Sequence, residues 1–312
     1  MRFHQILIIA VFLALNGCGI SSSQKDPNTR PEKDEQKLSE LDFWEDYTIS
    51  SDQYGTETRV VVAEGKRIMK TNALPNHSTG NFPNRGNPNR ISAQRLSYTF
   101  PLIPKFSGES KWAREPGIAL NGVKFEPETA ERFVCETGEV YRIEAFQELV
   151  DLGLDFNNAH VQPTGAYHYH GVPEGLVKVL DKGEDLVLVG FALDGFPIYY
   201  SKSGKYKPSY KLRENLRTGD ACSYQNPKQG MNKEMSGTQP DGTFVSDWEY
   251  VAELGNLDEC NGIALEEGYA YFVTAEYPYM SRCLKGVFSE RKRKGPPPHA
   301  HRHQRGHPPH NH

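Results

Sequence analysis

Three histidines stand close together in the stretch "HVQPTGAYHYHG", which runs from residue 160 to residue 171. They are His160, His168 and His170, and imidazole nitrogens are common ligands of zinc and copper. Away from the two ends of the chain, the sequence has only one further histidine, His77. Because histidine is so scarce elsewhere, its concentration here favours a shared role, and the stretch is a candidate metal site.

The spacing of these residues predicts which side chains can meet. Side chains on an extended strand point alternately to its two faces, so His168 and His170 are expected on one face. Tyr167 and Tyr169 then point to the opposite face. The segment "PTG" is typical of a turn, which would return His160 to the histidine face. Three converging imidazoles with an open fourth position predict a divalent transition-metal site, for zinc or copper.

Two other residues are lesser candidates for the same site. Asp194 occurs in "ALDGFPIYY", at the end of an apolar run. A carboxylate there is expected to bind the metal, orient an imidazole or act as a general base, although Asp-Gly is also a common hairpin turn. His77 occurs in the polar segment "LPNH", where the alternative is an ordinary surface histidine.

The sequence leaves three classes of function open. The first is metal binding without catalysis, and the second is a metal-dependent enzyme, hydrolytic or redox, at the same histidines. The third is a non-catalytic surface module, in which Tyr167, Tyr169 and neighbouring aromatic residues stack on a polysaccharide or another small ligand. The chain has no G-x-S-x-G, H-E-x-x-H, P-loop or dinucleotide glycine motif, so no reaction class is indicated.

The elements that must position these residues are mainly strands. Apolar and aromatic runs predict strands in "RVVVAEG", "GAYHYHG", "DLVLVGFALDG", "FPIYY" and "YAYFVTAEY". Helical spacing occurs only in "YRIEAFQELVDLG", residues 141–153, and residues 81–90 are too rich in Pro, Gly and Asn for either element. We therefore predict a mainly β fold, a single large sandwich-like domain over residues 41–288 with a few short helices and long ordered loops.

Composition limits the partners that the chain is expected to bind. The 312 residues include 36 basic and 40 acidic side chains, which give a net charge of −4. This balance argues against nucleic-acid binding. Residues 289–312 differ from the rest, since they are basic, Pro-rich and contain six histidines. They are predicted to form a low-complexity disordered tail.

The start of the chain is typical of an exported protein. Residues 1–18 combine an early arginine with the short apolar run "ILIIAVFLAL", and end in "LNGC", which resembles the lipobox of bacterial lipoproteins. The resemblance implies that Cys18 is lipidated and holds the protein at an outer membrane or cell surface. Residues 19–40 have few apolar groups and are predicted to be a flexible tether.

Export changes the interpretation of the four remaining cysteines, because an oxidising compartment favours disulfides over zinc. Four cysteines allow three pairings. Cys260 and Cys283 close the shortest C-terminal loop and are the pair that we predict, which leaves Cys135 with Cys222.

Several blocks closely resemble the YHYH proteins, a family named for the run that here is Tyr167 to His170. Besides this motif they include "LPNHSTGNFPNRGNPNRISAQ", "GIALNGVKFEPETA", "LVGFALDGFPIYY", "DWEYVAELGNLDECNG" and "YAYFVTAEYPYMSRCLKG". These blocks run from about residue 74 to residue 286. The resemblance implies relatives but no particular reaction.

Overall fold

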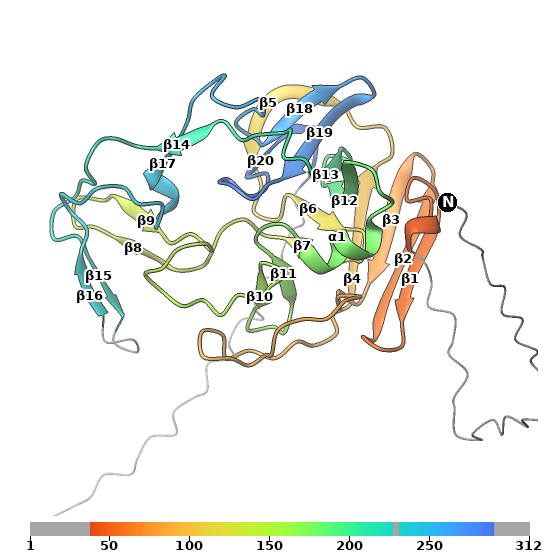
Figure 1. Ribbon diagram of the computed structural model, residues 1–312, viewed down its shortest axis with the longest axis horizontal. Helices are drawn as coiled ribbons and strands as arrows, with labels where there is room; N and C mark the ends of the chain where they lie inside the picture. The colour runs from red at the N-terminus through yellow and green to blue at the C-terminus, as the bar shows by residue number, and fades with distance from the viewer. Residues whose placement is uncertain (1–37, 227–230, 290–312) are drawn as a thin grey trace, which may run out of the picture. The chain divides into compact units, whose positions relative to one another are not determined.

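The computed structural model describes residues 38–226 and 231–289 (Figure 1). The predicted signal peptide, Cys18, nearly all of the tether and all but the first residue of the tail lie outside these ranges. The fold is mainly β, as predicted, and the described residues contain one α-helix, α1 (Glu174–Leu180). Among them, no helix is both long and apolar enough to cross a membrane.

The largest sheet has eight strands in the order β10-β11-β7-β6-β12-β13-β19-β18. Their bounds are β6 (Gly117–Ala119), β7 (Lys124–Phe125), β10 (Ala159–Val161), β11 (Tyr167–Tyr169), β12 (Leu186–Ala192), β13 (Pro197–Ser201), β18 (Gly262–Leu265) and β19 (Gly268–Val273). The pairs β11–β7 and β13–β19 are parallel and the others are antiparallel. The run "VLVGFA" in β12 is nearly continuous in apolar residues because this central strand is buried on both faces.

A second, four-stranded antiparallel sheet precedes the large one in the sequence. It consists of β1 (Tyr47–Ser51), β2 (Thr56–Ala63), β3 (Lys66–Thr71) and β4 (Leu96–Pro101). Burial alternates along β1, as expected for a strand with one packed and one solvated face. The long segment between β3 and β4 has no regular secondary structure, as predicted for residues 81–90 within it.

Four two-stranded pairs complete the architecture. They are β5 (Phe106–Trp112) with β20 (Cys283–Gly286), β8 (Arg132–Val134) with β9 (Val140–Arg142), β14 (Tyr210–Leu212) with β17 (Trp248–Tyr250), and β15 (Ser223–Asn226) with β16 (Met231–Glu234). Both predicted disulfides are present, Cys135–Cys222 and Cys260–Cys283. The two bridges indicate folding in an oxidising, extracytoplasmic compartment.

The helix predicted over residues 141–153 is wrong. Its first residues belong to β9, and Ile143 then forms an isolated β-bridge with Phe244. The amide of Glu144 donates to the carbonyl of Thr243 at 2.9 Å. These bonds to a segment about 100 residues away replace the local bonds of a helix, so tertiary pairing overrides the apolar spacing. The α-helix instead occurs at α1, whose apolar residues contact β12.

The predicted hairpin around Asp194 and Gly195 is confirmed. Strands β12 and β13 pair antiparallel on either side of it, and Gly195 has φ +92°, a conformation that favours glycine. A side chain at Gly195 would also meet the carbonyl oxygen of Pro101. The turn therefore requires glycine for both backbone conformation and space.

Candidate metal centre

Strands β10 and β11 bring the three histidines together. Their antiparallel register places His160 directly opposite His168, and His170 follows two residues later, just past the end of β11. A tight turn connects the strands, in which the amide of Gly165 donates to the carbonyl of Gln162 at 2.8 Å. All three imidazoles therefore share one face of the sheet, the histidine face, as the spacing predicts.

The geometry of the three rings suits a single ion. The ring centroids of each pair lie 4.7 Å apart, and one possible ligand nitrogen from each ring lies within 4.8 Å of the others. The Nε2 atoms of His160 and His170 are 3.1 Å apart. Tetrahedral zinc with bonds of about 2.0–2.1 Å to nitrogen separates its ligand atoms by about 3.3 Å. The observed spacing is thus close to that of two ligands on one metal.

Main-chain carbonyls fix the protonation of two of the rings. Nδ1 of His160 lies 2.9 Å from the carbonyl oxygen of Leu152, and Nδ1 of His168 lies 3.3 Å from that of Ala166. A carbonyl oxygen only accepts hydrogen bonds, so each Nδ1 carries the proton and each neutral ring has its lone pair on Nε2. Nδ1 of His170 is buried and has no partner among the described residues.

Burial keeps the three imidazoles neutral. His168 and His170 are only 2% and 1% exposed, whereas His160 is half-buried. This burial lowers the pKa of all three rings, and those of His168 and His170 fall well below the ordinary value. The neighbouring histidines and the ammonium of Lys124 lower the two latter values further. Neutral imidazole is the form that binds a metal, so little proton competition is expected near neutral pH.

The two tyrosines of the motif form the opposite face of β11, the tyrosine face. The hydroxyl of Tyr167 donates to Oδ2 of Asp155 at 2.7 Å. That of Tyr169 lies 2.6 Å from Nε2 of His77 and accepts from Nδ2 of Asn121 at 3.0 Å. Both tyrosines are at most 1% exposed, so neither ring is accessible for stacking on a glycan.

The structure does not bring His77 or Asp194 into the histidine group. His77 is buried, and its Nδ1 contacts the carbonyl of Ser78 while its Nε2 faces Tyr169, so it is neither a surface residue nor part of the cluster. The Asp194 carboxylate accepts hydrogen bonds from the hydroxyl of Tyr271 at 2.6 Å and the amide of Gly286 at 2.9 Å. These contacts tie the β12–β13 hairpin to β19 and β20.

Sequence reasoning missed the charged residues beside the cluster. Strand β7 runs parallel to β11 with Lys124 opposite His168, so Glu126, two residues on, reaches the level of His170 on the histidine face. The Lys124 ammonium contacts the carboxylates of Glu126 at 2.6 Å and Glu115 at 2.9 Å. The alternation in "VKFEP" predicts a strand with two charged residues on one face. It does not predict which strand lies next to it.

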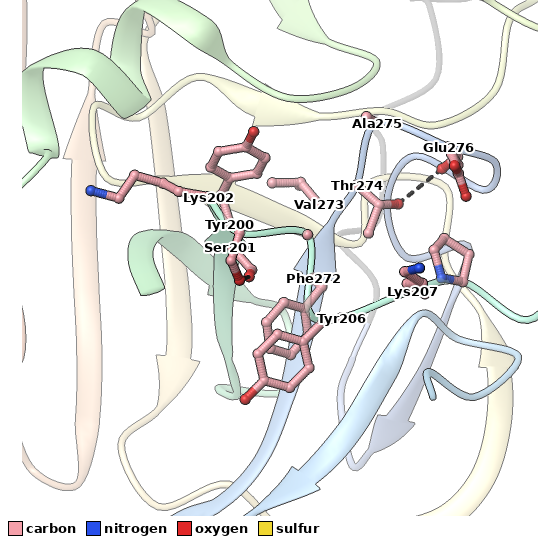
Figure 2. A pocket seen from close by; sticks show the side chains of 13 residues that line it. Tyr200, Ser201, Lys202, Tyr206, Lys207, Phe272, Val273, Thr274, Ala275 and Glu276 are labelled. Atoms are coloured by element: carbon pink, nitrogen blue, oxygen red, sulfur yellow. Dashed lines mark hydrogen bonds between the residues drawn. The ribbon is translucent and has the colours of Figure 1, made fainter. Parts of the chain in front are cut away.

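A surface pocket of about 370 Å³ occurs elsewhere on the protein, near the ends of β13 and β19 (Figure 2). Its lining includes Tyr200 and Thr274, and Tyr206 stacks on Phe272 with 4.2 Å between ring centroids. None of the three clustered histidines lines this pocket. The pocket and the histidine cluster are therefore separate features.

Comparisons with known proteins agree with the motif. A family model described as "YHYH protein" matches residues 97–286, a range that includes the whole β10–β11 hairpin. No curated protein matches the chain, and no solved structure matches it. The match covers more than half of the sequence, and the chain therefore belongs to the YHYH family.

Proposed function

We propose that this YHYH protein binds one divalent transition-metal ion, zinc or copper, through His160, His168 and His170. The observation that carries the proposal is the convergence of three imidazoles at 4.7 Å between ring centroids. In His160 and His168, Nδ1 donates to a backbone carbonyl, so the lone pair of each ring is on Nε2, on the other side of the ring. This is the arrangement that orients histidines for a metal.

A purely structural role accounts for less of the geometry. If Nε2 of His170 carries a proton, it can donate to Nε2 of His160 at their separation of 3.1 Å. That hydrogen bond would explain the contact between His160 and His170. It would not explain why the His168 ring lies beside both of them. A metal ion uses all three rings and one tautomer, with the proton on Nδ1, in each.

Zinc stoichiometry of the full chain tests the proposal. After mild chelation, the unaltered protein is titrated beside His168→Ala, His170→Ala and His77→Ala, and bound zinc is measured by elemental analysis. The histidines of residues 290–312 contribute equally to every variant. We expect His168→Ala and His170→Ala to lose one tightly bound equivalent that His77→Ala retains. Equal stoichiometry in all four proteins would show that the cluster is not the site.

Export and lipid anchoring at Cys18 are a second part of the proposal. The "LNGC" sequence and the two disulfides support it, since both fit a protein held on the outer side of a membrane. Detergent phase partitioning separates the alternatives. We expect the natural protein in the detergent phase and Cys18→Ser in the aqueous phase; if both partition alike into the aqueous phase, there is no lipid anchor.

A further inference from the structure

The pocket near β13 and β19 lies where two parallel strands end together. These strands are neighbours in the large sheet and run in the same direction, so their carboxyl ends share one edge. The chain continues through residues 202–209 after β13 and residues 274–282 after β19, and residues of both segments line the pocket (Figure 2). In open α/β sheets, crevices at this edge are where ligands bind. The volume of about 370 Å³ is in the range of small-molecule sites, about 300–1,000 Å³.

Three aromatic rings line the pocket, and one of them is left for a ligand. Tyr206 stacks on Phe272 with 4.2 Å between ring centroids, and the ammonium of Lys205 lies 5.3 Å from the centroid of the Tyr206 ring. Tyr200 is half-buried, and within the described residues its ring stacks on no other aromatic ring and on no cation. The Tyr200 ring is therefore the aromatic surface that the pocket offers.

The charged groups of the pocket balance each other. The Lys202 ammonium contacts the Asp181 carboxylate at 2.7 Å, and Figure 2 shows it directed away from the other lining side chains. The Lys207 ammonium and the Glu276 carboxylate are exposed and have no hydrogen-bond or ion-pair partner among the described residues. One unpaired positive group and one unpaired negative group leave no net charge. The pocket therefore favours an electrically neutral ligand over an anion or a cation.

The hydroxyl groups of the pocket differ in whether they are already used. Oγ1 of Thr274 donates to the carbonyl of Glu276 at 2.9 Å, and Oγ of Ser201 donates to Oδ2 of Asp185 at 2.9 Å (Figure 2 shows the first of these bonds). The Tyr200 hydroxyl has no hydrogen-bond partner in the part of the chain that the structure describes. A ligand thus meets one aromatic ring, one ammonium donor, one carboxylate acceptor and one hydroxyl. A purely apolar ligand would leave the three polar groups unmatched.

We propose that this pocket binds a neutral saccharide, with one sugar ring packed on Tyr200 and sugar hydroxyls bonded to Lys207 and Glu276. A hydroxyl group accepts from the ammonium and donates to the carboxylate, so one kind of ligand group satisfies both charges. The C–H groups of a sugar ring supply the apolar surface that covers the tyrosine ring. The site is independent of the proposed metal site, since none of the clustered histidines lines the pocket.

Saturation-transfer difference NMR on the full chain tests the proposal, because it detects weak sugar binding. The probes are maltose, cellobiose and N,N′-diacetylchitobiose, and we expect saturable transfer to at least one of them. Tyr200→Leu keeps apolar bulk but removes the ring and its hydroxyl, and should weaken binding of that probe about tenfold. The matched control is Tyr250→Leu, which changes an exposed tyrosine of β17 outside the pocket and should leave binding unchanged.

A second variant changes only an exposed side chain, so it tests the site even if Tyr200→Leu does not fold. Glu276→Ala should also weaken binding about tenfold, whereas Glu266→Ala, at an exposed glutamate between β18 and β19, should not. No transfer to any of the three probes overturns the proposal. Binding that is unchanged in Glu276→Ala overturns it too, because the sugar then lies elsewhere. Tighter binding of glucuronate or glucosamine than of glucose would contradict the preference for a neutral ligand.

Discussion

The two faces of strand β11 carry side chains of similar polarity but differ in how these are satisfied. On the tyrosine face, Tyr167 has Asp155 as its partner, and Tyr169 has His77 and Asn121. On the histidine face, Nε2 of His160 and Nε2 of His170 lie 3.1 Å apart, and Nδ1 of His170 has no partner in the described residues. Polar side chains whose atoms all have protein partners stabilise the fold, whereas ring nitrogens that converge on one another favour a bound ligand.

This contrast explains why the motif alternates the two residue types. The tyrosine face attaches the strand to the long segment between β3 and β4, because His77 belongs to that segment. Asp155, which accepts from Tyr167, also accepts from the amide of Gly80 in the same segment at 2.9 Å. The tyrosines thus fix the strand, and the fixed strand holds the histidines at the spacing that a metal requires.

The largest effect is expected for a substitution that changes the histidine face alone. His170→Ala removes one of three ligands, and we expect zinc affinity to fall by more than about 100-fold, since even residues that only orient a ligand are worth 10–100-fold. Competition titration with a zinc indicator measures the change. Tyr169→Phe is the matched variant on the other face of the same strand. A similar loss in Tyr169→Phe would mean that the two faces are not separable.

The next largest effect is expected for a substitution that removes the hydrogen-bond partner of the tyrosine face. Asp155→Ala leaves the Tyr167 hydroxyl and the Gly80 amide without their acceptor, and we expect the free energy of unfolding to fall by about 3 kcal/mol. Urea denaturation of the metal-free protein measures it. The folded fraction should still bind one equivalent of zinc. Unchanged stability would contradict the anchoring role of this face.

A smaller loss is expected for Tyr169→Phe, which keeps the buried ring and removes only the hydroxyl. Its partners, His77 and Asn121, lose one hydrogen bond each, at a cost of about 1–2 kcal/mol in the free energy of unfolding. The same denaturation experiment measures it, with His77→Ala as a companion. If the two changes are coupled, the double variant should be less destabilised than the sum of the single ones.

The last effect concerns pH and grows as the pH falls. Burial lowers the pKa of His168 and His170 in the folded protein, while the unfolded chain keeps the ordinary value of about 6.5. Below that pH the unfolded state binds more protons, so the metal-free protein loses stability as the pH falls, by up to about 1.4 kcal/mol per pH unit for each ring. His168→Leu should show a shallower pH dependence in urea denaturation between about pH 6.5 and 5. An identical slope would contradict the neutral, buried state of this ring.

Local patterns were enough to predict the histidine cluster but not its surroundings. The period of two along a strand and one turn determine how His160 meets His168, because all of these residues lie within twelve positions. Glu144 and Arg282 are separated by 138 positions, and their contact depends on how distant segments pack. The same packing overrides the helical spacing after residue 140. The segment "LPNH" was enough to make His77 a candidate residue. Its contact with Tyr169, 92 positions away, could not be predicted from that segment.

In the proposed metal site, three imidazoles of the histidine face bind one ion. X-ray absorption at the zinc edge, on full-length protein loaded with a single equivalent of zinc, tests it most directly. We expect a four-coordinate ion with three imidazole nitrogens at about 2.0–2.1 Å, and loss of this shell in His168→Ala. A shell dominated by oxygen, or an identical imidazole shell in His168→Ala, would contradict it.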